Sequence, residues 1–330
     1  MDSIAQLSTK ERSALFAETA ARLAMTPEIA EKDFWVTWVL HHLFSDQQLS
    51  RILMFKGGTS LSKAYGLIER FSEDIDLILD WRVLKSAGGD PLAERSKSKQ
   101  ANLNREIDTE SQAFIANDLL PQIRGALSGI CECEISSDDP HVINVVYPAA
   151  FSDAYLRPEV RLEIGPLAAW LPHEDRVILS YAAEAFPGLF KQAKCDVRVI
   201  RAERTFWEKA TILHHEAHRP EGNDQPLRYS RHYYDLAMMA DSPVKERALA
   251  DAALLADVVS FKERFYPRGW ARYDLAKPGT FKLLPPALLQ KTVERDYRAM
   301  RTMIFGTYPD FGDIVAQLQR LENEINNVVV

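Results

Sequence analysis

The chain has little of what would tie it to an extracellular or membrane setting. Its three cysteines, Cys131, Cys133 and Cys195, are too few for a disulfide framework and have no C-x-x-C spacing. Cys131 and Cys133 alone are also too few ligands to hold zinc. No apolar run approaches membrane-spanning length, and no positive-then-apolar segment marks a signal peptide. These absences predict reduced thiols in a soluble, cytoplasmic protein that has no membrane partner.

A strong excess of charge of one sign is also lacking. The formal net charge is −7, which does not suggest a nonspecific coat for DNA. Local patches matter more than the total. Residues 82–105 carry six Lys/Arg against two acids, and residues 262–301 carry ten against four. A polyanion could lie across these regions, although a solvated helix face is the commoner interpretation of such a pattern.

A glycine pair stands at the end of a short apolar run. Residues 52–55 indicate a strand, and Gly57 and Gly58 indicate a turn that lets the backbone come close to a ligand. A helix is expected from Thr59 to Leu67, and its first turn offers free N–H groups and the positive end of a dipole. The hydroxyls of Thr59 and Ser60 could add hydrogen bonds to phosphate oxygens. Lys63, one turn along, either joins them or is exposed to solvent.

Two aspartates follow sixteen residues after Gly58, within a second apolar run. Side chains alternate along a strand, so Asp74 and Asp76 face one way while Ile75 and Leu77 pack behind them. Two carboxylates at roughly 4 Å repel by about 4 kcal/mol at an effective dielectric near 20. Either one is protonated or a cation holds both, and Mg²⁺ or Mn²⁺ beside a nucleotide suits such a pair. The alternative is a strand edge with two solvated aspartates.

A third carboxylate lies in the run from Glu159 to Gly165. Val160, Leu162 and Ile164 alternate there with Arg161 and Glu163, so Glu163 faces away from the core. If this strand neighbours the Asp74 strand, Glu163 can bind the metal or act as the base that deprotonates an attacking hydroxyl. A solvated glutamate on a half-exposed strand fits the spacing equally well.

The order of the elements predicts an α/β (α+β) fold with a mixed sheet flanked by helices. The expected layout is a helical arm over residues 1–50, an α/β core over 51–201 and a helical lobe over 202–330. Helices are expected near 8–23, 27–43, 102–127, 206–215, 233–239, 244–261, 287–304 and 314–325, strands at 131–135, 142–147, 160–164 and 197–200, and a loop over 83–100.

The two motifs together resemble a known family. Gly-Gly-Thr-Ser-Leu-Ser-Lys followed by Arg-Phe-Ser-Glu-Asp-Ile-Asp-Leu is similar to the AbiEii/AbiGii-type (MenT-like) nucleotidyltransferase toxins of the DNA polymerase beta-like superfamily. The resemblance covers about half of the chain and implies Mg²⁺ at Asp74 and Asp76 and a role for Ser72 in nucleotide binding. It also implies a triphosphate contact by Lys209 in Arg-Thr-Phe-Trp-Glu-Lys-Ala. Asp235, in Arg-His-Tyr-Tyr-Asp-Leu, matches a further family aspartate and could orient Lys209 or the substrate, or form a plain salt bridge.

What this resemblance implies is a two-lobed enzyme that moves a nucleotide from an NTP onto an acceptor. tRNA 3′ ends serve as acceptors in some members, so tRNA or another RNA is expected here. The resemblance also implies a toxin–antitoxin or abortive-infection system with a cognate antitoxin protein.

Three alternatives remain open at the level of the sequence. The acceptor could be a protein hydroxyl instead of RNA, or the chain could bind nucleotide without turning it over. His214, His215 and His218 suggest a third reading, a histidine-dependent ribonuclease, because His214 and His218 share a helix face. The order H-H-E-A-H is not the H-E-x-x-H metalloprotease pattern, and the simplest interpretation is histidines at a helix C-terminus.

Overall fold

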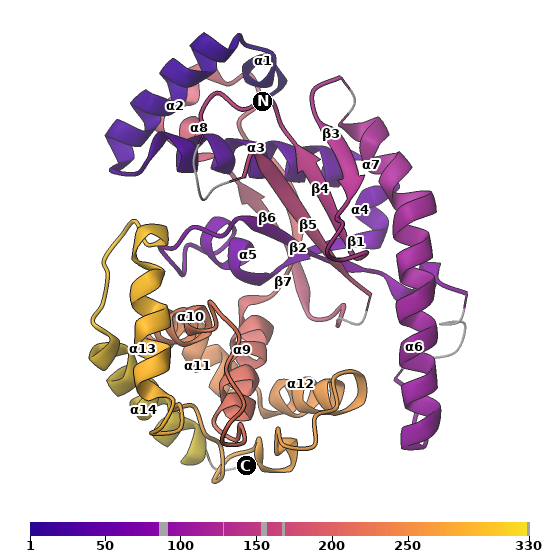
Figure 1. The fold of residues 1–330 in the computed structure, drawn as a ribbon, viewed down its shortest axis with the longest axis vertical. Coiled ribbons are helices and arrows are strands. Elements are labelled where there is room, and N and C mark those ends of the chain that lie inside the picture. Colours follow the sequence, from indigo (N-terminus) through magenta and orange to yellow (C-terminus); the bar gives the residue numbers. More distant parts are fainter. Residues whose placement is uncertain (86–91, 128, 153–156, 167–168, 329–330) are drawn as a thin grey trace. The chain divides into compact units, whose positions relative to one another are not determined.

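The computed structural model describes the chain except for residues 86–91, 128, 153–156, 167–168 and 329–330. The chain folds as two compact units. Unit 1 comprises Met1–Ala64 and Phe71–Ile200, and unit 2 comprises Tyr65–Arg70 and Arg201–Val330. Residues 65–70, between the glycine pair and the aspartate strand, therefore belong to the unit that otherwise holds the C-terminal helices (Figure 1).

The strands and helices of the described chain have the following bounds. The strands are β1 Leu53–Lys56, β2 Asp74–Leu79, β3 Glu132–Ile135, β4 Val142–Val146, β5 Glu159–Gly165, β6 His173–Ile178 and β7 Cys195–Ile200. The helices of unit 1 are α1 Asp2–Ala5, α2 Thr9–Leu23, α3 Pro27–Ser45, α4 Leu49–Ile52, α5 Gly57–Lys63, α6 Lys97–Phe114, α7 Leu120–Ala126 and α8 Tyr181–Ala185. Those of unit 2 are α9 Ala202–Glu216, α10 Ser230–Ala240, α11 Pro243–Leu249, α12 Ala252–Phe265, α13 Gln290–Ala299 and α14 Phe311–Asn326. A π-helical stretch, Ile115–Leu119, joins α6 to α7.

The strands of unit 1 form a mixed sheet in the order β3-β4-β5-β2-β1-β7-β6 (Figure 1). The aspartate strand β2 lies inside this sheet, parallel to β5 on one side and antiparallel to β1 on the other. Along β2, Ile75 and Leu77 are fully buried while Asp74 and Asp76 keep partial exposure. The mixed α/β class and the two-faced aspartate strand predicted from the sequence are confirmed.

The helix α3 anchors the N-terminal helices on the sheet. Thr26 caps it by accepting a hydrogen bond from the N–H of Ile29 at 3.4 Å, with Pro27 at the first helical position. It packs against α2 and α8 and against strands β5 and β7 (Figure 1). Trp35 and Trp38 are buried in these contacts.

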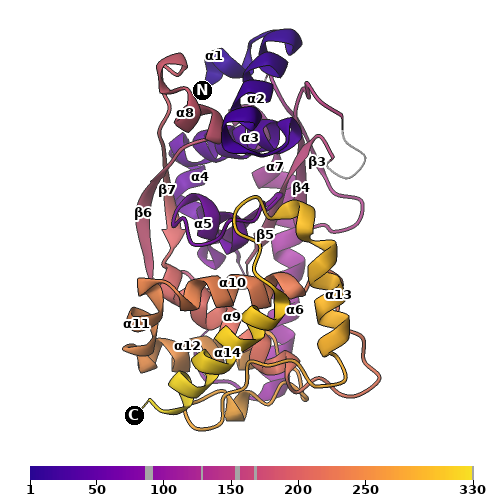
Figure 2. The ribbon, with the colours of Figure 1, turned by 90° about the vertical axis from the view of Figure 1, so that its left-hand side faces the viewer.

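Unit 2 is built from helices around α9 and α10. α9 packs against α10, α11 and α12, and α10 also packs against α13 and α14 (Figure 2). The segment 65–70 joins this unit through its backbone. The N–H of Glu69 donates to the Tyr234 hydroxyl at 3.3 Å, and the carbonyl of Glu69 accepts from Phe305 at 3.0 Å.

Some elements differ from the sequence prediction. α5 begins at Gly57 and ends at Lys63, earlier than the expected span of 59–67. The helix expected over 244–261 is two helices, because the Asp251 side chain caps the N–H of Leu254 and starts α12 afresh. The edge strand β6 has no apolar alternation and was not expected. The expected loop over 83–100 lies partly outside the described residues, and α6 begins within it. Among the residues described, no helix has the length and apolar character needed to cross a membrane.

Candidate active site

A row of charged side chains crosses one face of the sheet in unit 1. Asp76 pairs with Glu163 of β5 on one side and with Lys56 of β1 on the other. Asp74 pairs with Arg161, whose Nε lies 3.7 Å from Asp74 Oδ1. Directly paired residues of neighbouring strands project to the same face. β5 is therefore the neighbour of β2 that the sequence argument required, and its register puts Glu163 beside Asp76.

Gly57 is the residue against which the Asp76 carboxylate lies. A Cβ at this position would be 1.9 Å from Asp76 Oδ2, and the backbone φ of +80° is one that other L-residues rarely adopt. Both facts demand glycine here. In this structure, Gly57 therefore lets the turn come close to the Asp76 carboxylate.

The electrostatics of the aspartate pair favour a bound cation. Burial raises the pKa of Asp74, and the charges of Asp76 and Glu73 raise it further, while Arg161 opposes them. A carboxylate whose charged form is disfavoured in this way gains from a neighbouring cation. Hard oxygen donors on one face of the sheet fit Mg²⁺ or Mn²⁺.

The metal ligands are not assembled as a complete protein cage. Within the described residues, no group of three or more His, Cys, Asp or Glu is arranged to hold a metal ion. The donor set therefore fits a cation that is held by one or two carboxylates and completed by substrate, which is how Mg²⁺ is commonly bound beside phosphates.

The hydroxyls of the glycine turn are used inside the protein. Thr59 Oγ1 donates to the carbonyl of Asp74 at 2.5 Å, and Ser60 Oγ donates to the carbonyl of Gly57 at 2.8 Å. Both residues are buried. The structure therefore corrects the expectation that these hydroxyls donate to phosphate: Thr59 instead fixes the start of β2 against α5. Ser72 is half-buried, and its carbonyl lies 3.4 Å from Thr59 Oγ1.

Lys63 also differs from both sequence expectations. Its Nζ lies 2.7 Å from Asp33 Oδ1 and 4.0 Å from the centre of the Tyr181 ring, and its side chain is 5% exposed. Lys63 is thus buried, and its ammonium group contacts Asp33 and Tyr181. Its ammonium group is engaged within the protein, so its contribution is to hold the end of α5.

In unit 2, Lys209 and Asp235 form a buried ion pair. Lys209 Nζ donates to Asp235 Oδ2 at 2.6 Å. Arg70 donates two hydrogen bonds to the same carboxylate, from Nε to Oδ1 at 2.6 Å and from Nη2 to Oδ2 at 2.8 Å. The Asp235 side chain is fully buried. The cluster therefore holds two cations against a single anion.

The pKa values of this cluster follow from that imbalance. Burial alone would raise the pKa of Asp235, but the charges and hydrogen bonds of Arg70 and Lys209 outweigh burial and lower it. Burial lowers the pKa of Lys209, and the nearby Arg70 charge acts in the same direction. Asp235 is thus held ionised and orients the Lys209 ammonium group.

Sequence reasoning did not single out Lys56 or Arg70, and it assigned no role to Arg161. Lys56 directly precedes the glycine pair, and Arg70 opens the second quoted segment. Strand alternation could have placed Lys56 once its partner strand was known. The partner of Arg70 lies 165 residues away, and no local pattern indicates it.

His214 of α9 has a structural role. His214 is fully buried, its Nε2 lies 3.0 Å from the Arg272 carbonyl, and its Nδ1 accepts from the N–H of Lys282 at 3.1 Å. Burial lowers the pKa of His214 to about 4. Both ring nitrogens are occupied by backbone groups, so His214 has no nitrogen left for acid–base catalysis. These contacts argue against His214 as the acid–base residue of a ribonuclease.

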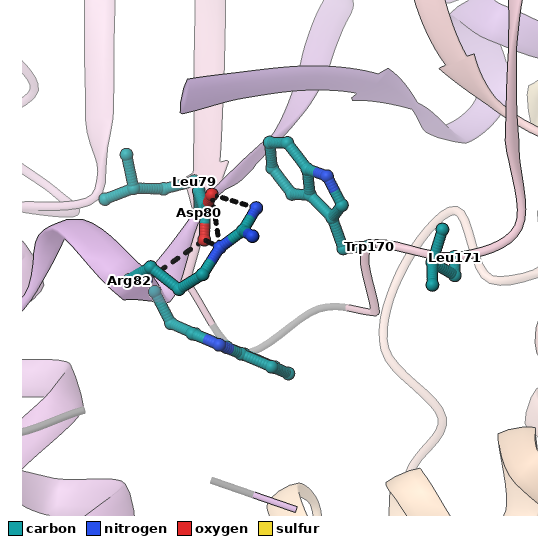
Figure 3. A pocket seen from close by; sticks show the side chains of 6 residues that line it. Leu79, Asp80, Arg82, Trp170 and Leu171 are labelled. Atoms are coloured by element: carbon teal, nitrogen blue, oxygen red, sulfur yellow. Dashed lines mark hydrogen bonds and ion pairs between the residues drawn. The ribbon is translucent and has the colours of Figure 1, made fainter. Parts of the chain in front are cut away.

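Figure 3 shows a pocket of unit 1. It is lined by Leu79, Asp80, Trp81, Arg82, Trp170 and Leu171. The Arg82 guanidinium is fixed on Asp80, with Nη2 2.6 Å from Oδ2, and lies 6.0 Å from the centre of the Trp170 ring. Leu79 ends β2, and Asp80, Trp81 and Arg82 directly follow it, whereas Asp74 opens that strand. About 17 Å of strand separates them, so the pocket is not part of the carboxylate site.

Comparisons with known proteins identify the family of the chain. The family model described as nucleotidyl transferase AbiEii toxin, type IV TA system, matches residues 38–317, which is most of the chain. No curated protein matches the chain. Among solved structures, MenT4, a nucleotidyltransferase toxin from Mycobacterium tuberculosis H37Rv, is similar at 18% identity and a TM-score of 0.46, over 98% of this chain and 100% of that one. A protein from H. pylori, described as a candidate nucleotidyltransferase, is similar at 15% identity and a TM-score of 0.44, over 91% of this chain and 98% of that one.

Proposed function

Since the chain belongs to the AbiEii family of nucleotidyl transferase toxins of type IV toxin–antitoxin systems, we propose that it transfers a nucleotide from an NTP to an RNA hydroxyl with the help of Mg²⁺ or Mn²⁺. Family membership makes the chain a nucleotidyltransferase toxin with an NTP substrate and a cognate antitoxin. The metal, the RNA acceptor and the residue roles are the proposal.

The observation that carries the proposal is the pairing of Asp76 with Glu163 on the face that also holds Asp74. Asp74 and Asp76 hold the metal, and Glu163 either completes its shell or takes the proton of the acceptor hydroxyl. When bound, the metal would supply positive charge for the α-phosphate and the leaving pyrophosphate. Arg161, 3.7 Å from Asp74, balances part of the negative charge of this face.

The remaining site residues bind and orient the NTP. The backbone of Gly57, Gly58, Thr59 and Ser60, at the start of α5, offers N–H groups to phosphate oxygens, and Ser72 adds a polar group before β2. Lys209 neutralises triphosphate charge, which suits a flexible ammonium group on a long stem. Asp235 orients Lys209 by accepting its hydrogen bond, and Arg70 holds the Asp235 carboxylate in place. Lys63 acts indirectly, by fixing α5 through Asp33.

RNA, and tRNA in particular, is the proposed acceptor. The basic stretches at 82–105 and 262–301 suit a polyanion, although a binding protein of net charge −7 must rely on such local patches. The 3′-terminal hydroxyl of an RNA can attack the α-phosphorus in line. Pyrophosphate then leaves, and Lys209, together with the metal when bound, would stabilise the negative charge that develops on it.

Transfer of radioactive label tests this proposal. The protein is incubated with each α-labelled NTP, Mg²⁺ and a total cell extract, and the product is digested with ribonuclease or with protease. We expect a labelled species that ribonuclease destroys and protease does not, and no label with Asp76→Ala. Label that only protease removes would replace RNA with a protein acceptor, and label that survives Asp76→Ala would refute the carboxylate mechanism. Nucleotide binding without any label in Mg²⁺ or Mn²⁺ would leave a binding module in place of an enzyme.

A further inference from the structure

Three consecutive charged residues lie buried in the middle of α3. Glu31, Lys32 and Asp33 are each no more than 2% exposed, on a helix whose other buried residues are mainly apolar. Burying a charge is costly unless it is paired, and a buried ion pair is often no more stable than an apolar pair of the same volume. Stability alone therefore gives little reason for this triplet.

The contacts of the triplet indicate another reason. Successive helical residues point about 100° apart, so each of the three side chains reaches a different segment. Glu31 accepts from the N–H groups of Ala150 and Phe151 at 2.7 and 3.0 Å. Asp33 holds Lys63 at the end of α5 and accepts from the N–H of Tyr181 at 2.6 Å.

Lys32 makes the contacts closest to the carboxylates. Its Nζ donates to Glu73 Oε2 at 3.0 Å and to the carbonyl of Arg157 at 3.4 Å. Glu73 stands one residue before β2, and Arg157 stands two residues before β5. These strands are parallel neighbours, so their amino-terminal ends lie side by side at the same end of the sheet. One ammonium group thus joins the starts of the two strands that carry Asp74, Asp76 and Glu163.

We propose that Lys32 is a positioning residue for the metal-binding carboxylates, because it clamps the start of β2 to the start of β5 through Glu73 and the Arg157 carbonyl. Asp33 complements it by fixing α5, and with it the Gly57 turn against which Asp76 lies. This inference rests on the proposed function, since it assumes that the carboxylates hold a divalent cation. Groups that orient metal ligands typically contribute about 10- to 100-fold to metal affinity.

The test measures Mn²⁺ affinity directly, by electron paramagnetic resonance titration of the full chain without nucleotide. We expect Lys32→Met to weaken Mn²⁺ binding about tenfold. A purely electrostatic role predicts the opposite sign, because removing a positive charge near the site would tighten binding. A purely structural role predicts a lower melting temperature with unchanged affinity. Tighter or unchanged binding by a folded Lys32→Met variant would therefore overturn the proposal.

A double-mutant cycle with Glu73 sharpens the result. If the pair acts as a clamp, Glu73→Ala weakens binding as Lys32→Met does, and the double variant is no weaker than the weaker single one. If only charge matters, the double variant returns to the wild-type affinity. Should Lys32→Met not fold, Glu73→Gln replaces it. The amide still accepts from Lys32, so the clamp predicts near wild-type binding, whereas affinity as low as that of Glu73→Ala would refute it.

Two controls separate this inference from the proposed function. Lys10→Met removes an exposed lysine of α2 and should leave Mn²⁺ affinity unchanged. Asp76→Ala should remove Mn²⁺ binding. If wild type binds no Mn²⁺, or if Asp76→Ala binds it unchanged, the proposed metal site itself is wrong. If both behave as expected and the Lys32 variants bind as wild type does, only the clamp is wrong.

Discussion

Replacement of Asp235 by asparagine should strongly destabilise the protein, because it removes the buried negative charge that Arg70 and Lys209 both contact. The Asp235 carboxylate accepts from Arg70 at 2.6 and 2.8 Å and from Lys209 at 2.6 Å. Asparagine keeps the shape but turns one acceptor into a donor that faces a cation. Breaking a buried ion pair on one side typically costs about 3–5 kcal/mol. That is a large fraction of the roughly 5–15 kcal/mol that stabilises an ordinary domain.

The assay is urea unfolding at pH 7, followed by circular dichroism. Asp175→Asn is the matched control, since that carboxylate lies 3.6 Å from Arg198 but is 79% exposed, and the free energy of unfolding should stay within the error of the fit. The triple variant Arg70→Met, Lys209→Met, Asp235→Leu should regain most of the lost stability while remaining inactive in nucleotide transfer. A loss below about 1 kcal/mol in Asp235→Asn would refute the reasoning, because it would mean that the two cations need no partner.

Three further predictions concern the carboxylate face and the core. Gly57→Ala should abolish transfer and destabilise the protein by at least about 1 kcal/mol, because the new methyl group meets the Asp76 carboxylate at a φ of +80°. Gly188→Ala, which meets nothing within 4 Å, should change neither activity nor unfolding. Removal of divalent cations with EDTA should stop transfer and leave the circular dichroism spectrum intact, and transfer that persists in EDTA would contradict the metal proposal. The pKa of His214 falls from 6.5 to about 4 on folding, so the unfolded chain takes up the proton first as the pH drops. The free energy of unfolding should therefore fall by up to about 3 kcal/mol between pH 6.5 and 4, and His214→Gln should lose most of that slope in urea titrations.

Local patterns sufficed for much of the fold. Alternation along residues 74–77 and 159–165 predicted which side chains are buried, because side chains alternate between the two faces of a strand. The helices α2 and α3, which Ser8 and Thr26 cap, likewise begin near residues 8 and 27, where helices were expected. Such features depend on neighbours in the sequence, so they are available without a structure.

Features that depend on distant partners were not predictable. Whether Glu163 lies beside Asp76 depends on the order of the strands, which no single strand encodes. Arg70 was overlooked because its carboxylate partner comes 165 residues later. Thr59 and Lys63 are residue types that often bind phosphate. In the structure, however, Thr59 donates to the Asp74 carbonyl and Lys63 pairs with the Asp33 carboxylate. A buried polar group must find a partner, and the protein supplies these partners from other elements.

The most direct test of the account is a calorimetric titration of Mn²⁺ into the protein and into its Asp74→Asn and Asp76→Asn variants. Wild type should bind the ion with measurable heat, and each variant should lose that binding while its circular dichroism spectrum stays unchanged. Equal binding by wild type and a folded Asp76→Asn variant would contradict the claim that this strand holds the metal for nucleotide transfer.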